Sequence, residues 1–362
     1  MMIERLLATG LLTAMLATTL ALPNAAFAQA ELPAGYKLTV SAVTQPLPTQ
    51  PQYTLVDQPI LRDGLAKATN GAITVQLSTH AERSLGGAEI VRLVRSGQVD
   101  IGASTLSTLS GDVPILDGVD LTGLSPDIAK ARKIAEAMLP ATNKELERFN
   151  TRLVVLYPFP AQVLFCRSEF KTLADLKGRK IRTFGNSLVD LVQKLGGQPV
   201  SIGFPEVYSA LERGVVDCAV TGTGSGAAAR WPEVSTHISN LPLSWAVAGY
   251  MVNLTWWNKL PPSAQAALEK SFAEVSDALW KLGDAATRDG IDCNIGNKDN
   301  CKIHALASRP MTEVKATAED KALVADIMKT AVLPGFVKRC GERCGTVYNE
   351  VIAPISGVEF KP

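Results

Sequence analysis

In the first half of the chain, short runs rich in β-branched residues alternate with longer runs of helical periodicity. Runs of the first kind predict strands, and runs of the second kind predict amphipathic helices. We expect strands at 37–43, 72–77 and 99–103, with helices at 58–68 and 88–95 between them. Strands that alternate with helices of this length predict an α/β fold built in layers.

The same local pattern occurs once in each half of the chain. Residues 90–101 and 207–218 each carry a helical run that stops at a glycine and enters a strand through valine and aspartate. Gly97 and Gly214 are placed as left-handed helix stops, where a side chain would cost energy. Two similar lobes would show such a repeat, although units of this kind are common enough to recur by chance.

Two further helices are expected later in the chain. Thr172 and Asp175 have capping-box spacing and Gly178 follows, which predicts a short helix that leads into a strand at 180–184. A long helix should start after Pro261-Pro262-Ser263. Its apolar stripe consists of Leu268, Phe272, Val275, Leu279 and Leu282. This helix is either an ordinary core helix or a spine that lies across two lobes.

The N-terminal segment has the features of a secretory signal. An apolar run at 6–22 precedes Ala26-Phe27-Ala28, a small-x-small cleavage pattern, so we expect residues 1–28 to be removed and the protein to be periplasmic. The alternative is a membrane anchor, but the run is short for a bilayer span. More than 300 residues would remain, enough for two domains.

The charge balance argues against some partners. The formal net charge is +1 and no basic block occurs along the chain. Nucleic acid and anionic membrane surfaces are therefore poor partners for this protein.

Six cysteines in an exported protein indicate disulfides. Cys293 and Cys301 bracket a short polar loop, which they are expected to close. Cys340 and Cys344 are four residues apart, and one helical turn brings such Cα atoms to roughly 6 Å, within disulfide range.

The remaining two cysteines leave an alternative open. Cys166 and Cys218 sit in apolar, strand-like runs. They either pair, if those strands are neighbours, or stay as buried free thiols.

The sequence gives little support for an enzyme active site or a metal site. His80, His237 and His304 lie far apart without zinc-type spacing, so we expect no metal and no cofactor. The run 222–226 is Gly-Thr-Gly-Ser-Gly, which lacks the ending of a phosphate loop and misplaces the serine of a nucleophile elbow. We interpret it as a flexible, close-approach loop after a strand at 215–220. At such a strand end, the hydroxyls of Thr221, Thr223 and Ser225 are candidates to face a ligand.

Arg182 is the most informative single charge. It lies in the strand expected at 180–184, whose end at Gly185-Asn186 should open on a cleft. A guanidinium there offers a planar, permanently charged fork that matches a carboxylate. The alternative from spacing alone is an arginine on the surface of a strand.

Three blocks, in this order and spacing, carry a family resemblance. They are Lys-Thr-Leu-Ala-Asp-Leu-Lys-Gly-Arg-Lys-Ile-Arg at 171–182, Leu-Gly-Gly-Gln-Pro-Val at 195–200 and Glu-Val-Tyr-Ser-Ala-Leu-Glu-Arg-Gly-Val-Val-Asp at 206–217. The chain resembles the substrate-binding subunits of tripartite ATP-independent periplasmic (TRAP) transporters, the DctP-like family, from residue 36 to its end.

The resemblance implies a fold and a function. The fold is a two-lobed α/β periplasmic binding protein, with a mixed sheet in each lobe and a long C-terminal spine helix. Lobe I would hold residues 31–159 plus about 248–287, and lobe II 160–247 plus about 288–362. The protein would capture a small organic carboxylate through Arg182 and deliver it to TRAP permease subunits by transient contact, without being an enzyme. The alternative is a ligand-binding input protein for a membrane sensor.

The chain departs from the sialic acid-binding members at four positions. Gln162 stands where those members have a second arginine, and Thr105 stands for an acid after the first-lobe strand. Val220 and Thr221 replace a Glu-Asn pair. A buried charge without a partner costs several kcal/mol, so a second carboxylate or an amine would lose its partners here.

These departures favour a monocarboxylate with a modestly polar or apolar body, such as an aromatic or a short oxo acid. Trp245 either packs on that body or belongs to the core. The candidate ligand-binding residues are Arg182, Gln162, Thr221, Thr105, Trp245, Asn186 and Ser225.

Overall fold

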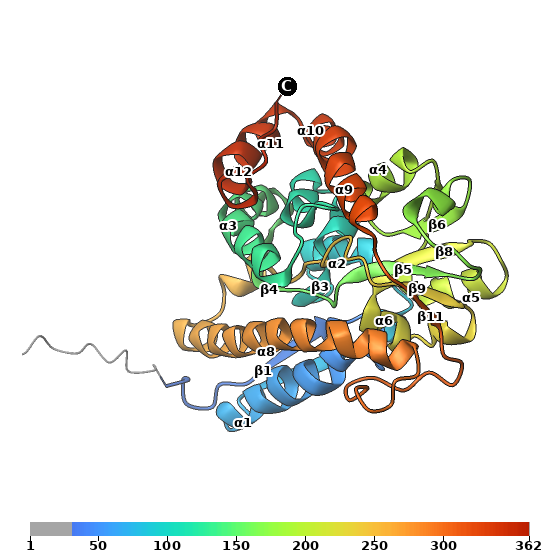
Figure 1. Cartoon of the computed structure of the whole chain (residues 1–362). Helices are drawn as coiled ribbons and strands as arrows, with labels where there is room; N and C mark the ends of the chain where they lie inside the picture. The colour runs from blue at the N-terminus through green and yellow to red at the C-terminus, as the bar shows by residue number, and fades with distance from the viewer. Residues whose placement is uncertain (1–30, 362) are drawn as a thin grey trace, which may run out of the picture.

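The structure is a computed structural model that describes residues 31–361, and the signal segment expected at 1–28 lies outside these residues. Its first sheet has the strand order β2-β1-β3-β10-β4 (Figure 1). The strands are β1 Leu38–Val43, β2 Ile73–Ser78, β3 Ile101–Thr105, β4 Thr151–Tyr157 and β10 Ala248–Asn253. β1, β2 and β3 are parallel, whereas β10 runs antiparallel to both of its neighbours.

The second sheet has the order β11-β9-β5-β8-β6-β7. Its strands are β5 Gln162–Cys166, β6 Lys180–Thr183, β7 Gln198–Ser201, β8 Cys218–Gly222, β9 His237–Ser239 and β11 Thr312–Val314. β6 is parallel to β7 and β8, whereas β5 is antiparallel to β8 and β9. Both sheets are mixed, which confirms the expected fold class.

The long helix is α8, Pro262–Asn294. The predicted stripe residues from Leu268 to Leu279 are buried in the apolar core beside the first sheet. The far end of α8 packs on α6, Thr223–Ala228, beside the second sheet. Figure 1 shows α8 in orange passing along both groups of strands, as a spine helix would.

The C-terminal helices contact elements from both halves of the chain. They are α9 Ala318–Ile327, α10 Leu333–Cys340, α11 Glu342–Val347 and α12 Ala353–Ser356. α12 packs on α3, Ile128–Leu146, and α10 packs on α4, Asn186–Lys194. Arg339 of α10 pairs with Asp190 of α4 at 2.7 Å and with Asp117 at 3.3 Å.

The other helices of the described chain are short. They are α1 Leu65–Ala68, α2 Ile90–Ser96, α5 Val207–Glu212 and α7 Leu254–Trp257. A π-helical segment at Tyr53–Gly64 runs directly into α1, so this helix starts earlier than the expected residue 58. Gly97 and Gly214 have φ of 73° and 71°, which confirms both as left-handed helix stops.

The glycine-rich run corrects one expectation. Residues after Gly222 form α6 and not a flexible loop. The glycines instead allow close packing: a Cβ at Gly224 would lie 2.2 Å from His304 Nε2, and one at Gly226 would lie 2.3 Å from Phe165 Cζ. The close approach was predicted correctly, but the flexibility was wrong because neighbouring side chains fill the space.

Three disulfides link the six cysteines. Cys293–Cys301 and Cys340–Cys344 are the pairs expected from spacing. The register of β5 and β8 places Cys166 directly opposite Cys218, and their Cα atoms are 4.1 Å apart in the disulfide. Cys166 and Cys218 therefore pair across adjacent strands and are not free thiols, a choice that the spacing had left open.

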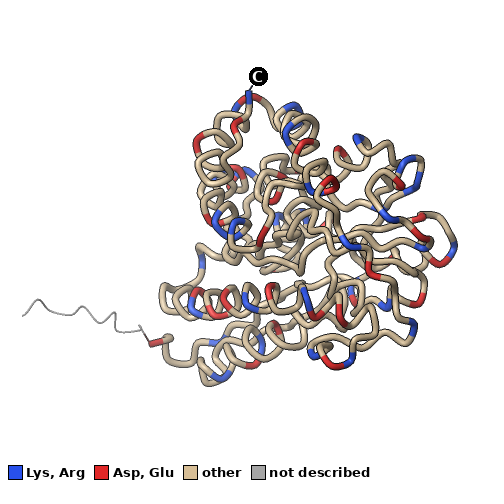
Figure 2. Tube along the Cα trace, in the orientation of Figure 1, with Lys and Arg blue, Asp and Glu red and all other residues tan. Residues whose placement is uncertain are grey.

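Charged residues of both signs are interspersed along the trace in Figure 2. Within residues 31–361, no helix combines the length and the apolarity that a membrane crossing needs.

Candidate functional site

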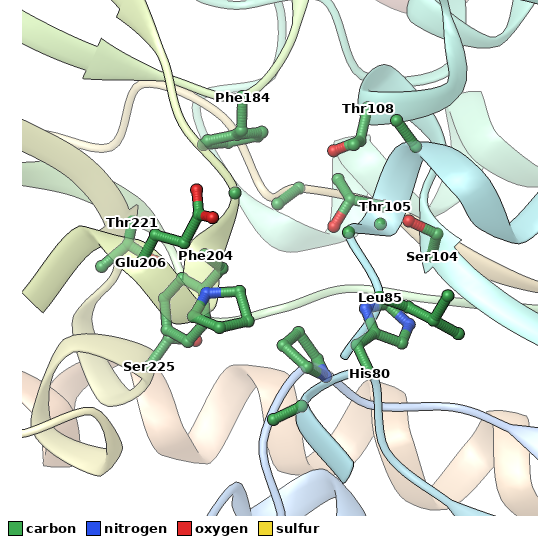
Figure 3. A pocket seen from close by; sticks show the side chains of 18 of the residues that line it. His80, Leu85, Ser104, Thr105, Thr108, Phe184, Phe204, Glu206, Thr221 and Ser225 are labelled. Atoms are coloured by element: carbon green, nitrogen blue, oxygen red, sulfur yellow. The ribbon is translucent and has the colours of Figure 1, made fainter. Parts of the chain in front are cut away.

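A cleft of about 740 Å³ lies between the two sheets. Figure 3 shows Ser104, Thr105 and Thr108 on one wall, facing Phe184, Phe204 and Thr221 on the other. The first group comes from β3 and the turn after it. In the second group, Phe184 follows β6, Phe204 begins a short 3₁₀ helix after β7, and Thr221 lies in β8. Each sheet thus contributes a strand-end wall.

Arg182 of β6 lines this cleft and is only 3 % exposed. Its Nε donates to the main-chain oxygen of Ile202 at 2.9 Å, and its Nη1 donates to that of Val220 at 2.8 Å. Ile202 follows β7 and Val220 lies within β8, so the second sheet fixes the position of the guanidinium. The remaining N–H groups of Arg182 have no hydrogen-bond acceptor among residues 31–361.

The electrostatics of Arg182 are those of a partly compensated charge. In the part of the chain that the structure describes, no carboxylate lies within ion-pair distance of it. Burial lowers the pKa of the guanidinium to about 9. The rings of Phe184 and Phe204 lie 5.2 and 5.9 Å from its Cζ, which gives some cation–π stabilisation.

Four other candidate residues line the same cleft: Gln162, Thr221, Ser225 and Thr105. Gln162 Nε2 donates to the main-chain oxygen of Pro160 at 2.8 Å. Thr105 is half-buried on the opposite wall, at the end of β3. Thr223, in contrast, turns away and donates to Thr287 of α8 at 2.8 Å.

Trp245 and Asn186 are not among the residues that line the cleft. Trp245 is buried in the core, where its Nε1 donates to the main-chain oxygen of Ser125 at 3.1 Å. Asn186 Nδ2 donates to Ser110 Oγ at 3.0 Å, so its amide links α4 to the first half of the chain. Ala246, next to Trp245 in the sequence, does line the cleft and has φ of 43°.

Sequence reasoning missed several lining residues, chiefly His80, Tyr157, Phe184, Phe204 and Glu206. Glu206 begins the block at 206–217 and Phe204 lies two residues before it, so closeness to this block was the one sequence feature that could have identified them. His80 Nε2 lies 2.8 Å from the Ala103 oxygen, and burial lowers the pKa of this imidazole. Nothing in the spacing pointed to Tyr157.

A buried carboxylate supports the first-sheet wall of the cleft from behind. Asp57 accepts from Thr44 Oγ1 at 2.6 Å, from Gln45 Nε2 at 3.0 Å and from the hydroxyl of Tyr250. Burial raises the pKa of Asp57 to about 6, although these three donors oppose the rise. Thr44 itself lines the cleft, so the network fixes part of its wall.

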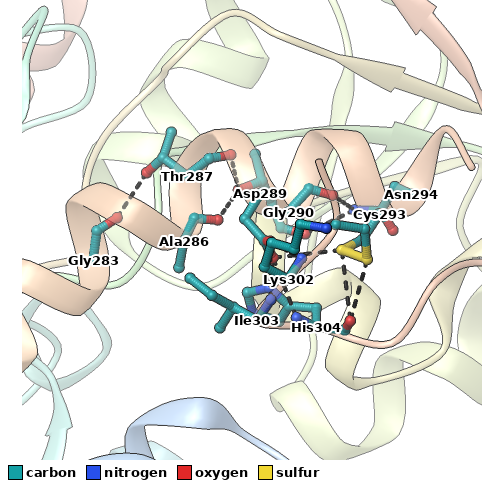
Figure 4. A network of polar contacts seen from close by, with 12 residues as sticks. Gly283, Ala286, Thr287, Asp289, Gly290, Cys293, Asn294, Lys302, Ile303 and His304 are labelled. Atoms are coloured by element: carbon teal, nitrogen blue, oxygen red, sulfur yellow. Dashed lines mark hydrogen bonds and ion pairs between the residues drawn. A yellow bond between two sulfur atoms is a disulfide. The ribbon is translucent and has the colours of Figure 1, made fainter. Parts of the chain in front are cut away.

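One cluster has the composition of a metal site, but its residues are not among those that line the cleft. Asp289, Cys293 and His304 bring ligand atoms within 4.8 Å of one another. The Cys293 sulfur is bonded to Cys301, and Asp289 accepts hydrogen bonds from His304 Nδ1 at 2.7 Å and from Ile303 N at 2.9 Å (Figure 4). These atoms hold the disulfide-closed loop on α8.

Family and fold comparisons agree with this geometry. The family model described as bacterial extracellular solute-binding protein, family 7 (DctP) matches residues 47–319. The chain is 28% identical over 225 residues to the 2,3-diketo-L-gulonate-binding periplasmic protein YiaO of Escherichia coli (strain K12), covering 61% of this chain and 68% of that protein. It is 23% identical over 214 residues to the C4-dicarboxylate-binding periplasmic protein DctP of Rhodobacter capsulatus, covering 58% and 64%.

Solved structures share the fold. DctP7 of Bordetella pertussis, an extracytoplasmic solute receptor binding pyroglutamic acid, has a TM-score of 0.76 at 20% identity, covering 87% of this chain and 99% of its own. A TRAP solute-binding protein of Desulfovibrio salexigens with bound orotic acid has a TM-score of 0.76 at 19% identity, covering 88% and 99%. Because the family model matches most of this chain, the chain belongs to bacterial extracellular solute-binding protein family 7, the DctP family of TRAP substrate-binding subunits.

Proposed function

We propose that this protein captures a small monocarboxylate in the periplasm and delivers it to TRAP permease subunits. The observation that carries the proposal is the buried Arg182 guanidinium, which faces the cleft without an acidic partner among residues 31–361. A buried cation needs an anion to offset its desolvation, and a ligand carboxylate matches its planar fork.

The rest of the lining supports a single carboxylate. Arg182 is the one arginine or lysine among the described residues that line the cleft. Glu206, also in the lining, would repel a second carboxylate, and Phe184 and Phe204 favour an apolar body. The relatives whose names report ligands bind several kinds of carboxylate, so the family leaves this choice to the individual cleft.

Closure of the cleft completes the proposed mechanism. Lobe I consists of residues 31–159 plus about 248–287, and lobe II of 160–247 plus about 288–362. The ligand binds between the open lobes, Arg182 fixes its carboxylate, and the permease recognises the closed form.

Ligand binding is tested by a thermal-shift screen of organic acids on dialysed protein. Monocarboxylates should raise the melting temperature, since a ligand at 100 times its Kd adds about 2.7 kcal/mol of stability. The corresponding primary amides, which lack the charge, should have no effect. A shift of equal size with acid and amide would contradict the carboxylate assignment.

Delivery needs a separate measurement. Proteoliposomes that contain the cognate permease subunits should accumulate the labelled acid only when the loaded protein is outside. Uptake at the same rate without the protein would show that it does not serve this transporter, and binding would then serve another role such as sensing.

A further inference from the structure

We propose that reduction of the Cys293–Cys301 disulfide creates a zinc site, in which the two cysteines, His304 and Asp289 supply the four ligands. These residues lie at the end of α8 and are not among those that line the cleft, so the inference is independent of the proposed function. Three observations support it, namely the types of atom that meet there, the distances between them, and the main-chain groups that orient the carboxylate.

The four side chains form a ligand set that suits zinc. Thiolate sulfur, imidazole nitrogen and carboxylate oxygen are the atoms that bind Zn²⁺ in proteins, and structural sites use four of them. Asp289 and Cys293 are one turn apart on α8, and Cys301 and His304 are separated by two residues in the segment that follows. The expectation of no metal rested on the wide separation of the three histidines, whereas here one histidine meets two sulfurs and a carboxylate.

The ligand atoms already have nearly the spacing that zinc requires. Asp289 Oδ2 lies 3.4 Å from Cys293 Sγ and 2.7 Å from His304 Nδ1, and one atom from each of these residues lies within 4.8 Å of the other two. Zinc bonds of about 2.0 to 2.3 Å at tetrahedral angles place neighbouring ligand atoms about 3.3 to 3.8 Å apart. Cys301 lies in an irregular segment between α8 and β11, so its sulfur can move the additional distance of about 2 Å from Cys293 Sγ once the disulfide is reduced.

Main-chain groups orient the carboxylate toward these atoms (Figure 4). Asp289 Oδ1 accepts from Lys302 N and from Ile303 N at 2.9 Å, whereas Oδ2 accepts from His304 N at 3.2 Å and lies beside the sulfur and the imidazole. Hydrogen bonds of this kind fix the orientation of a carboxylate that binds a metal. The side chains of His304 and Asp289 are 1 % and 6 % exposed and Cys293 is fully buried, so little water competes for the metal.

The reaction balances with a dithiol as the reductant. The dithiol gives two electrons and two protons to the disulfide and becomes a disulfide itself, while Cys293 and Cys301 become thiols. Zn²⁺ then binds both sulfurs and displaces the two thiol protons to solvent. His304 binds the metal through Nδ1, whose proton moves to Nε2, so the metal takes the place of the proton between Nδ1 and Asp289.

Zinc titration of the reduced protein tests the proposal. Protein that has been reduced with a dithiol and desalted under nitrogen should bind one Zn²⁺ at this site, measured by competition with a chromophoric chelator. The oxidised protein should bind zinc at least about 100 times more weakly, because a thiolate is a metal ligand and a disulfide is not. Co²⁺ in place of Zn²⁺ should give the thiolate-to-metal charge-transfer absorption of cysteine ligation. Equal zinc affinity of the reduced and the oxidised protein would overturn the proposal.

The disulfide Cys340–Cys344 offers a matched control. Its cysteines belong to no cluster of three or more potential metal ligands within residues 31–361. The double variant Cys293→Ser, Cys301→Ser should therefore lose the tight zinc site after reduction, whereas the double variant Cys340→Ser, Cys344→Ser should keep it. Equal loss in both double variants, or loss in neither, would contradict the assignment.

Single variants test the two other ligands. His304→Gln and Asp289→Asn should each raise the Kd of the reduced protein for zinc at least about tenfold, because loss of even an outer partner of a metal ligand costs that much. Zinc affinity unchanged in both variants would show that the cysteines bind zinc without them, and the proposed four-ligand site would be wrong.

Alkylation of the reduced parent gives a readout that needs no variant. Saturating zinc should slow the reaction of Cys293 and Cys301 with iodoacetamide at least about tenfold, because a thiolate bound to zinc is a weaker nucleophile. The rates at Cys340 and Cys344 should change little, and mass spectrometry of the peptides resolves the two pairs. Equal protection of both pairs, or protection of neither, would show that zinc does not bind at this site.

Discussion

The Nη1 of Arg182 donates a hydrogen bond of 2.8 Å to the main-chain oxygen of Val220, on the neighbouring strand of the second sheet. A main-chain acceptor compensates part of the charge and cannot neutralise it. The guanidinium is therefore held in place and still needs an anion, which is the state expected of a preorganised carboxylate site.

Replacement of Arg182 should abolish high-affinity binding. Arg182→Ala leaves the ligand carboxylate buried without its partner, which costs about 3–5 kcal/mol, or a hundredfold or more in affinity. Arg182→Lys should also weaken binding because an ammonium cannot form the two-pronged contact. Calorimetry with the best acid from the screen measures both, and exposed Arg213→Ala is the control. Affinity within a few fold of the parent in Arg182→Ala would contradict the carboxylate clamp.

Asp117 should make the stability of the protein depend on pH. Burial raises its pKa from 3.8 to about 7. The positive charge of Arg339, which also pairs with Asp190, offsets only part of this rise in pKa. The unfolded chain releases this proton near pH 4, whereas the folded protein keeps it to about pH 7. The unfolded state thus binds fewer protons, and the contribution of Asp117 to the free energy of unfolding falls by about 4 kcal/mol across that window.

Asp117→Asn cannot titrate and tests this prediction. The free energy of unfolding of the variant, minus that of the parent, should increase as the pH rises from 4 to 8. Urea unfolding at steps of one pH unit measures it, with exposed Asp299→Asn as the control. A difference that stays constant over this range would show that Asp117 does not hold a proton in the folded protein.

The disulfide between the central strands should stabilise the protein more than the loop disulfide. Its cysteines, Cys166 and Cys218, are 52 residues apart, against 8 for Cys293 and Cys301. In the chain-entropy account, replacing Cys166 and Cys218 by alanines lowers the free energy of unfolding by about 4 kcal/mol, and replacing Cys293 and Cys301 lowers it by about 2.5 kcal/mol. Denaturant unfolding of the two double variants gives the comparison. Free thiols at 166 and 218 in the unreduced, unfolded parent would refute the first bridge.

Gly224→Ala should destabilise the fold through His304. The added Cβ would lie 2.2 Å from Nε2 of an imidazole that Asp289 holds by a 2.7 Å contact, so the ring cannot move aside freely. We expect a loss of about 1–3 kcal/mol in the free energy of unfolding. Gly111→Ala, where no atom lies within 4 Å of the new Cβ, should change stability by no more than about 0.5 kcal/mol. Equal effects at both sites would contradict the packing argument.

The sequence by itself determined the local elements and the family. Helix stops at Gly97 and Gly214, the capping box at Thr172 and the apolar stripe of α8 depend on neighbours along the chain, where backbone and periodic preferences act. The same local information predicted α/β layers and the Cys293–Cys301 bridge. It failed at Gly224, where a distant imidazole occupies the space that a side chain would need.

Only the tertiary structure decided which residues face one another. Arg182, Gln162 and Thr105 come from three strands in two sheets, and the cleft exists only once both sheets have formed. Trp245 and Asn186 were also candidates from the sequence, but Trp245 is buried in the core and Asn186 is held by a hydrogen bond to Ser110. Packing and strand register act between residues far apart in sequence, so composition and local spacing do not predict which residues they bring together.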